Sequence, residues 1–514
     1  MRVFKKPALI LFLNTGFLAL GLSGCSIVGD EPPRQPTPDF NPTLDVRLTA
    51  KQVTVPLFEG PLTDALTYDP EVLSGDATKV ASLTDSYLGP IIRVRTGERL
   101  RVRLRNDLDE QTIIHWHGMR VPPEMDGHPR FAIEPGEEFA YEFVVRDRAA
   151  TYWFHPHSHG NTATQVYRGL AGLLLVADDE EDAIGLPAGD CDLPIVIQDR
   201  LFDGSNQLVY SHTGMMMDGF LGDTILVNGQ PDFQLSVATR AYRLRLLNGS
   251  NSRTYKLAWD DSSPLVAIAT DGGLLERPVE RDYVTLAPGE RVDLWADFSK
   301  YALGTELTLR SLEFKGADFG MMMGGHGSVT GPANGTPMDI MRVRIDRQES
   351  ENAAVPDTLS VASRPLVQDA VNALSPRTFS VSFLMHAMMG GQWGFDGRRF
   401  EMNGVREHEV IPFNTVEVWE IRNETSPVVM NHPIHIHGAQ FQIIERSVSS
   451  TFAQGWNSIN QGYVDDGWKD TFLLMPGERA KILIRFEDFT GQYLYHCHNL
   501  EHADSGMMRN LRVQ

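Results

Sequence analysis

The sequence predicts an all-β protein made of β-sandwich domains. Apolar and polar residues alternate in several segments, as they do in strands that bury one face. These segments lie at 100–105, 139–143, 242–246 and 482–486. Long amphipathic helical patterns are scarce, and 514 residues are too many for one hydrophobic core. The strands are therefore expected to form several sandwich-type domains.

An internal repeat indicates where these domains lie. In each copy a strand ends in an asparagine, and a Pro-Gly-Glu segment followed by another strand comes later. The asparagines are Asn106, Asn248 and Asn423, and the Pro-Gly-Glu segments are 135–137, 288–290 and 476–478. Three copies imply three related domains. We place them near 46–180, 190–345 and 375–514, with the polar, proline-containing stretch 346–374 as a linker.

Residues 1–25 have the features of a bacterial lipoprotein signal peptide. A positive start precedes a mostly apolar run, 8–22, which is short for a membrane span. The run ends in Leu22-Ser23-Gly24-Cys25, which resembles a lipobox and implies cleavage before Cys25 and a lipid on its thiol. An ordinary signal peptide is the alternative. We expect an exported, membrane-anchored lipoprotein that faces the periplasm or the cell surface, with 26–45 as a flexible tether.

Composition limits the partners. The formal net charge of -21 argues against nucleic acid or an anionic membrane surface, so membrane contact is expected only through a lipid on Cys25. The chain has three cysteines, Cys25, Cys191 and Cys497, so a disulfide framework is not expected.

Ten of the sixteen histidines lie in or just after four short motifs. They are His115, His117, His155, His157, His432, His435, His437, His496, His498 and His502. His115 lies nine residues after Asn106, and His432 lies nine residues after Asn423. Domain two has no histidine at the equivalent positions. We therefore expect a metal site that domains one and three share and to which domain two contributes no ligand.

The residue types favour copper. On a strand, residues i and i+2 point to the same face, so four His-x-His pairs can offer eight nitrogens to one cavity. That number exceeds one ion and suits a cluster of borderline ions. Cys497 faces away from its two neighbours and can bind a separate copper with His432 and His502, with Met507 as a weak axial ligand. Zinc storage, the alternative, has no use for an axial methionine.

These motifs resemble those of the three-domain multicopper oxidases, which include laccases, copper-efflux oxidases and bilirubin oxidases. The resemblance runs from about residue 46 to the end and implies three cupredoxin-like Greek-key β-sandwich domains with four copper ions. It implies that the type 1 copper is bound by His432, Cys497, His502 and Met507, and the type 2 copper by His115 and His435. It implies that one type 3 copper is bound by His117, His155 and His498, and the other by His157, His437 and His496.

The resemblance also implies an activity. A reductant would give single electrons through Cys497, and dioxygen would be reduced to water with protons from nearby carboxylates. Asp126 matches an acidic position of the bacterial relatives, although it could be only a turn residue. A second acidic position is Ala503 here, so Asp504 or Glu501 is the candidate substitute. Asp470 could orient a ligand histidine or cap a strand edge.

The reducing substrate stays open between Cu(I), which would suit a role in copper tolerance, and phenols or aromatic amines. Fe(II) is a weaker option. Methionines, which are soft ligands for Cu(I), cluster at 215–217, 321–323 and 385–389. A copper-binding or storage lipoprotein is the alternative outside enzymes. Six histidines are not expected to bind the cluster: His128, His159, His212, His326, His386 and His408.

Overall fold

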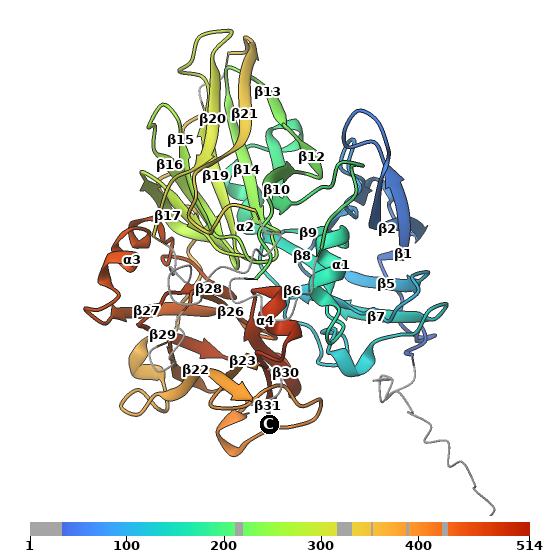
Figure 1. Cartoon of the computed structure of the whole chain (residues 1–514), viewed down its shortest axis with the longest axis vertical. Coiled ribbons are helices and arrows are strands. Elements are labelled where there is room, and N and C mark those ends of the chain that lie inside the picture. The colour runs from blue at the N-terminus through green and yellow to red at the C-terminus, as the bar shows by residue number, and fades with distance from the viewer. Residues whose placement is uncertain (1–32, 211–218, 316–330, 351–352, 387–389, 424–429) are drawn as a thin grey trace, which may run out of the picture.

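The structure, a computed structural model, describes residues 33–210, 219–315, 331–350, 353–386, 390–423 and 430–514 (Figure 1). Its strands form six sheets, two in each third of the chain. Each pair of sheets encloses its own core of buried apolar side chains. The protein is all-β, as the alternation of apolar and polar residues predicts.

Domain one contains a four-stranded and a five-stranded sheet. The first has the order β2 (Thr63–Ser74), β1 (Leu44–Val55), β5 (Arg99–Asn106) and β7 (Glu138–Val144). The second has the order β3 (Val80–Ala81), β4 (Ile91–Arg95), β9 (Gly172–Ala177), β8 (Ala150–Pro156) and β6 (Ile114–His117). The strands β6 and β8, which carry histidine motifs, therefore pair at one edge of their sheet.

Domain two contains a seven-stranded and a five-stranded sheet. The larger sheet has the order β12 (Gln230–Pro231), β11 (Thr224–Val227), β10 (Asp192–Arg200), β14 (Ala241–Asn248), β19 (Arg291–Asp297), β16 (Leu265–Thr270) and β17 (Gly273–Arg281). The smaller has the order β13 (Gln234–Ala238), β21 (Met338–Arg347), β20 (Glu306–Ser311), β15 (Tyr255–Trp259) and β18 (Val284–Leu286).

Domain three contains two five-stranded sheets. One has the order β23 (Gly390–Phe395), β22 (Arg377–His386), β25 (Val416–Arg422), β29 (Glu478–Arg485) and β27 (Phe441–Val448). The other has the order β24 (Val410–Ile411), β31 (Met508–Val513), β30 (Gly491–Cys497), β26 (His432–Ile436) and β28 (Thr471–Leu474). Here too the histidine-bearing strands, β26 and β30, are neighbours.

Helices are short throughout the described residues. The α-helices are α1 (Thr162–Arg168), α2 (Asp179–Ile184), α3 (Ala453–Asn457) and α4 (Leu500–Asp504). The 3₁₀ turns are η1 (Ala77–Lys79), η2 (Pro129–Phe131), η3 (Gly189–Cys191), η4 (Val367–Asp369), η5 (Glu407–Glu409) and η6 (Asn460–Gly462). None of the helices in this part of the chain has the length and apolar character that crossing a bilayer requires.

The sequence repeat corresponds to a repeated structural unit. The backbone N–H of the glycine in each Pro-Gly-Glu turn donates to the carbonyl of its asparagine: Gly136 to Asn106, Gly289 to Asn248 and Gly477 to Asn423. All three glycines have positive φ, between 69° and 86°, which a side chain would disfavour. In each domain the end of one strand, at the asparagine, is therefore hydrogen-bonded to the turn that precedes a later strand.

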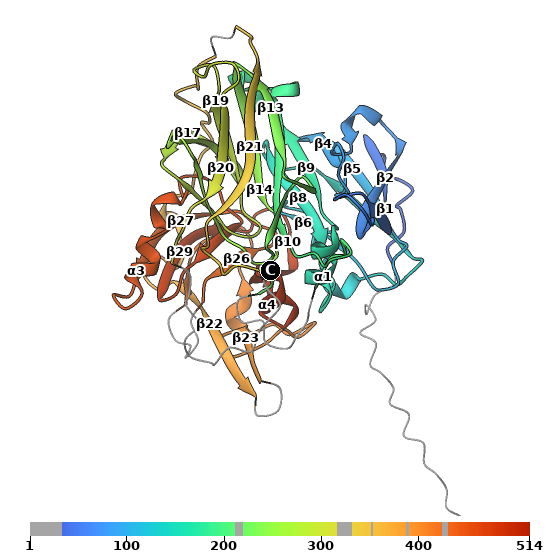
Figure 2. The same ribbon diagram turned by 45° about the horizontal axis from the view of Figure 1, so that its top comes forward.

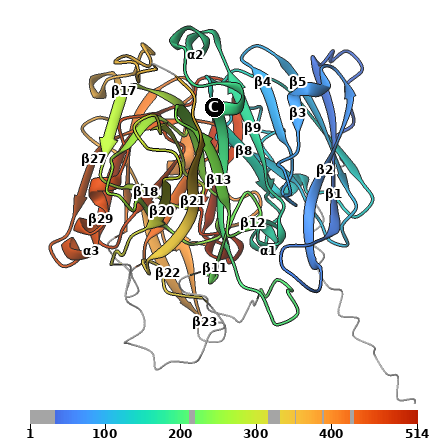
Figure 3. The same ribbon diagram turned by 90° about the horizontal axis from the view of Figure 1, so that it is seen from above.

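The three sandwiches pack closely against one another, as three views show (Figures 1, 2 and 3). Trp153 and Leu173 of domain one share an apolar cluster with Val196 and Leu226 of domain two. Smaller clusters join domain two to domain three and α1 to α4. The histidine-bearing strands of domains one and three meet where all three domains come together.

The alternation of apolar and polar residues predicts the wrong exposure for the polar face of β14. Arg243 and Arg245 were expected on a polar, exposed face, but they are only 2% and 4% exposed. Arg243 pairs with Asp293 at 2.6 Å, and Arg245 Nη1 donates to Thr151 Oγ1 of domain one. The face is buried by the neighbouring domain, and ion pairs compensate the buried charges.

Residues 34–45, the second half of the stretch 26–45, contact domain one. Phe40 packs under the Arg99 guanidinium, 4.3 Å from its ring centroid, and β1 begins at Leu44. The carbonyl of Arg34 accepts the N–H of Ala140 in β7. Contacts of this kind hold residues 34–45 on domain one. The signal peptide, Cys25 and residues 26–32 lie outside the described residues.

Candidate metal centres

Eight buried histidines converge between domains one and three. Four come from β6 and β8 or the residue after it, and four come from β26 and β30 or the residues that follow these strands. They are His115, His117, His155, His157, His435, His437, His496 and His498, each at most 3% exposed. Register explains the convergence, because His115 pairs with His155 across β6–β8 and His435 pairs with His496 across β26–β30.

The ring nitrogens approach one another closely. His115 Nε2 lies 3.2 Å from His435 Nε2, and His117 Nδ1 lies 3.4 Å from His155 Nε2. His496 Nε2 lies 3.3 Å from His157 Nε2 and 3.1 Å from His437 Nε2. Each of these pairs belongs to one of the ligand sets that the family resemblance implies. His498 is fully buried, and neither of its ring nitrogens has a hydrogen-bond partner.

The far nitrogens of most of these rings are held by fixed acceptors. Nδ1 of His115 donates to the Asp126 carbonyl at 2.7 Å, and Nδ1 of His435 faces the Asp470 carbonyl at 2.9 Å. His437 Nδ1 faces Asp126 Oδ2 at 2.7 Å. An imidazole that donates through one nitrogen presents the lone pair of the other. These rings are therefore oriented with Nε2 toward the common cavity.

The cavity fits metal ions. Burial lowers the pKa of these imidazoles below the usual value, so they are neutral and can act as ligands. The nitrogens that face one another across 3.1–3.4 Å in the cavity mostly carry lone pairs, so there are too few N–H groups for each of these nitrogens to accept a hydrogen bond. Cations between the rings would accept one lone pair from each ring, including one of the two nitrogens of His498 that lack a hydrogen-bond partner.

A second set of donors lies in domain three. Cys497 Sγ lies 3.4 Å from His432 Nδ1 and 3.7 Å from His502 Nδ1. All three side chains are buried, as is Met507, whose carbonyl accepts the N–H of Cys497. Burial raises the pKa of the Cys497 thiol, so a bound cation is what would favour the thiolate there. Thiolate, two imidazoles and a nearby methionine suit copper.

Comparison with known proteins decides the family. Models of multicopper oxidase domains match residues 66–181 and 376–514. The protein named multicopper oxidase mco from Staphylococcus aureus is 32% identical over 447 residues, 86% of this chain and 86% of that protein. The chain belongs to the multicopper oxidase family. A laccase of Bacillus stratosphericus is 31% identical and covers 85% of this chain and 91% of the laccase.

The fold comparison agrees. The crystal structure of the McoA multicopper oxidase of Aquifex aeolicus matches with a TM-score of 0.75 and 32% identity, covering 92% of this chain and 97% of that one. The three sandwiches are therefore cupredoxin-like, as the resemblance implied. The protein is an oxidoreductase that binds copper and uses dioxygen together with a reducing substrate.

The carboxylates predicted to supply protons lie in different surroundings. Asp126 of the oxidase is buried against the cluster: Oδ2 contacts His437, Oδ1 has no hydrogen-bond partner, and burial raises the pKa of the carboxyl. Asp504 instead accepts the N–H groups of Thr162 and Ala163, so its two oxygens face the N-terminus of α1. Burial raises the pKa of Asp504 to about 7.

Glu501, the other candidate, joins α4 to domain two. Its carboxylate accepts hydrogen bonds from Tyr210, Asn251 and Ser252 at 2.6–2.8 Å. It therefore ties the segment next to His502 to the neighbouring domain. A proton role for either Glu501 or Asp504 stays a prediction.

Three of the histidines that are not expected to bind the cluster have side chains in the described part of the chain, and each contacts another residue. His128 is buried and contacts Asn510 Oδ1 at 2.9 Å, and His159 packs on Phe400. His408 lies 3.2 Å from Asp396 Oδ2. His212, His326 and the methionines at 215–217, 321–323, 388 and 389 lie outside the described residues, as do the side chains of Met385 and His386.

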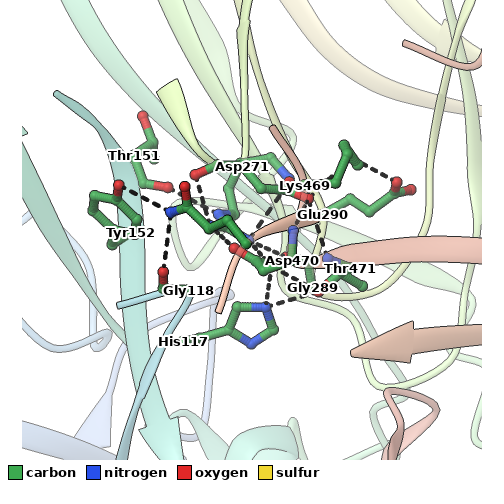
Figure 4. Close-up of polar contacts among 12 residues, drawn as sticks. His117, Gly118, Thr151, Tyr152, Asp271, Gly289, Glu290, Lys469, Asp470 and Thr471 are labelled. Carbon is green, nitrogen blue, oxygen red and sulfur yellow. Dashed lines mark hydrogen bonds and ion pairs between the residues drawn. The ribbon is translucent and has the colours of Figure 1, made fainter. Parts of the chain in front are cut away.

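Two residues next to the site, Trp393 and Arg291, carry no signal in the sequence motifs. Trp393 of β23 packs on both His432 and His502, with ring centroids 4.6 and 5.5 Å away, and is 2% exposed. Asp470, which the sequence offered as a residue that could orient a ligand histidine, contacts His117 (Figure 4). It also pairs with Arg291 of domain two. Sequence gave no metal-type signal in domain two, so only spatial proximity identifies Arg291.

Proposed function

We propose that the oxidase holds four copper ions and reduces dioxygen to water with electrons from a one-electron donor. The type 1 ion would be held by His432, Cys497, His502 and Met507, and the type 2 ion by His115 and His435. The type 3 pair would be held by His117, His155 and His498 and by His157, His437 and His496. The close approach of neutral, buried imidazoles from two domains is the observation that supports this assignment.

Bound copper would supply the one-electron steps and the four-electron reduction of dioxygen. Cys497 is joined by peptide bonds to His496 and His498, so the thiolate-bearing residue connects the two centres through a short covalent path. Asp126 Oδ2 lies 2.7 Å from His437 Nδ1 and is placed to hand protons to the cavity. The fully buried rings exclude bulk water from the cluster.

Cu(I) is the reducing substrate that the surroundings of Cys497 favour. His432 and His502 are 0% and 1% exposed, and Trp393 packs on both, which hinders direct contact with a bulky phenol. Trp393 belongs to β23, which begins at Gly390, and β22 ends at His386. In the sequence, the three methionines of 385–389 therefore lie at the end of β22 or just before β23. A thioether-rich segment joined to this strand would suit Cu(I) delivery and a role in copper tolerance. Laccase-type oxidation of phenols and aromatic amines is the second candidate.

Export as a lipoprotein anchored through Cys25 would place this activity at the periplasm or the cell surface. The apolar run 8–22 and the Leu22-Ser23-Gly24-Cys25 segment support it. Incorporation of radiolabelled palmitate into the wild-type chain but not into Cys25→Ala would test it. Equal labelling of both would refute lipidation at Cys25.

An oxygen electrode separates the candidate functions. Copper-loaded protein is given Cu(I), a phenol or Fe(II), and the kcat/KM values are compared with those of Met388→Leu/Met389→Leu. For a cuprous oxidase, the double variant loses efficiency with Cu(I) and keeps it with the phenol. Equal loss with both substrates, or a wild-type preference for the phenol, contradicts the Cu(I) proposal. Copper loading without oxygen uptake from any donor would favour a storage protein.

A further inference from the structure

Domain two forms part of the wall of the histidine cluster although it supplies no ligand. Its Pro-Gly-Glu turn places Gly289 directly on the rings: an added Cβ would lie 3.0 Å from His117 Cε1 and 3.1 Å from His498 Cδ2. The next residue but one, Arg291, begins β19 and is fully buried. The turn at 288–290 and Arg291 therefore reach the cluster from the third domain.

Arg291 joins all three domains. Its Nη1 and Nη2 donate to Oδ1 and Oδ2 of Asp470 in domain three at 2.8 and 2.6 Å, and its Nε donates to the carbonyl of Thr151 in domain one at 2.8 Å. A planar guanidinium that binds both carboxylate oxygens fixes the plane of that carboxylate. Asp271 of domain two supports the pair, because its Oδ2 lies 3.2 Å from the backbone N–H of Asp470.

The clamped carboxylate holds a ligand ring. Asp470 Oδ1 lies 3.0 Å from His117 Nε2, and Thr471 Oγ1 lies 2.9 Å from the same nitrogen. With its Nε2–H donated to these oxygens, His117 presents Nδ1, which lies 3.4 Å from His155 Nε2. Among the rings described above, His115, His435 and His437 are held through Nδ1, the opposite nitrogen.

We infer that Arg291 is a positioning residue of the oxidase: through Asp470 it fixes the orientation and tautomer of His117, so that domain two sets the geometry of a copper ligand it does not contribute. The inference rests on the proposed assignment of His117 as a ligand. A hydrogen-bond acceptor on one nitrogen of a ligand imidazole fixes the tautomer and makes the other nitrogen a stronger ligand. Loss of such an acceptor costs about 10–100-fold in metal affinity.

The test compares Arg291→Lys with Arg243→Lys. Lysine keeps the charge but loses the two-point contact. Arg243 is a matched control, since it is also a buried arginine of domain two, paired with Asp293 at 2.6 Å. Each copper-loaded variant is dialysed against increasing EDTA, and copper per chain, the electron paramagnetic resonance spectrum and the colour of the Cys497 site are recorded.

Arg291→Lys is expected to lose cluster copper at an EDTA concentration about 10–100-fold lower than wild type, with an altered resonance spectrum and an unchanged Cys497 colour. Asp470→Asn should reproduce this result, and adding Arg291→Lys to it should have little further effect. Arg243→Lys should match wild type in all three measurements. Arg291→Lys behaving as Arg243→Lys does would overturn the inference.

A second variant covers a failure of Arg291→Lys to fold. Gly289→Ala leaves the Arg291–Asp470 pair in place and pushes on His117 and His498, so it should also release cluster copper selectively. Gly289→Ala with wild-type retention of copper would contradict a positioning role for this part of domain two. A wild-type chain that never holds more than one copper refutes the proposed four-copper function instead, which is a different outcome.

Discussion

His115 of domain one and His435 of domain three lie with their Nε2 atoms 3.2 Å apart. Neither domain can build this pair alone, so metal bound there joins two separately folded sandwiches. A ligand that binds only the assembled form stabilises that form by a free energy that grows with the logarithm of the ligand concentration over Kd.

Removal of copper is therefore expected to lower the melting temperature. At free copper about 1,000 times Kd, binding contributes about 4 kcal/mol to stability. Calorimetry of the loaded and EDTA-stripped protein measures the difference. His435→Ala should lose the part of the copper-dependent increase that comes from the ion bound between His115 and His435. Identical melting curves with and without copper would contradict a site shared between the domains.

Replacement of Cys497 by serine should remove the colour and one copper per chain while the cluster stays loaded. The hydroxyl is a much harder donor than a thiolate and binds copper poorly in this His₂Cys set. Absorption spectra and copper analysis follow the change. The control is Cys191→Ser, a buried cysteine that is not expected to bind copper. Loss of all four ions in Cys497→Ser would show that the two centres are not independent.

Asp126→Asn is expected to slow oxygen reduction and to leave reduction of the Cys497 copper unchanged. The amide cannot deliver a proton from Oδ2, which lies 2.7 Å from His437 Nδ1. Stopped-flow reduction without oxygen and reoxidation with oxygen separate the two steps. Unchanged reoxidation would mean that Asp126 acts only as a support for His437.

Asp504→Ala should act mainly on stability. Its carboxylate accepts the N–H groups of Thr162 and Ala163 at the start of α1, and the loss of such a cap costs about 1 kcal/mol. Denaturant unfolding measures the cost, and oxygen uptake serves as the second readout. Slower oxygen reduction at unchanged stability would favour the proton role that the sequence suggests for this residue.

Arg243→Ala should destabilise the fold by about 3–5 kcal/mol, because it removes a buried cation that pairs with both Asp293 and Glu181 and leaves Asp293 only the more distant Arg245. The matched control is Arg310→Ala, whose partner Asp339 and own side chain are about half exposed or more. That change should cost at most about 1 kcal/mol. Equal unfolding free energies for the two variants would show that the buried ion pair of Arg243 stabilises the fold no more than an exposed one does.

Much of the site was predictable because local patterns carry it. The period of two in β5 and β29 is enough to identify strands, and the His-x-His spacing puts both rings on one face. The repeated asparagine and Pro-Gly-Glu segments could also be found in the sequence, because each pair, such as Asn248 and Gly289, forms its contact within one domain. Residues whose role depends on a contact with another domain show no such local sequence pattern.

The sequence by itself determined the sandwich class, the threefold repeat and the residue types that face the cavities, because these follow from short-range periodicity and from the chemistry of imidazole and thiolate. Only the tertiary structure decided that Arg243 is buried, that Asp504 caps α1 and that Arg291 reaches His117 through Asp470. Asp504 and Arg291 have their partners on other domains, and the face that carries Arg243 lies against a neighbouring domain. No local pattern records which surfaces will meet.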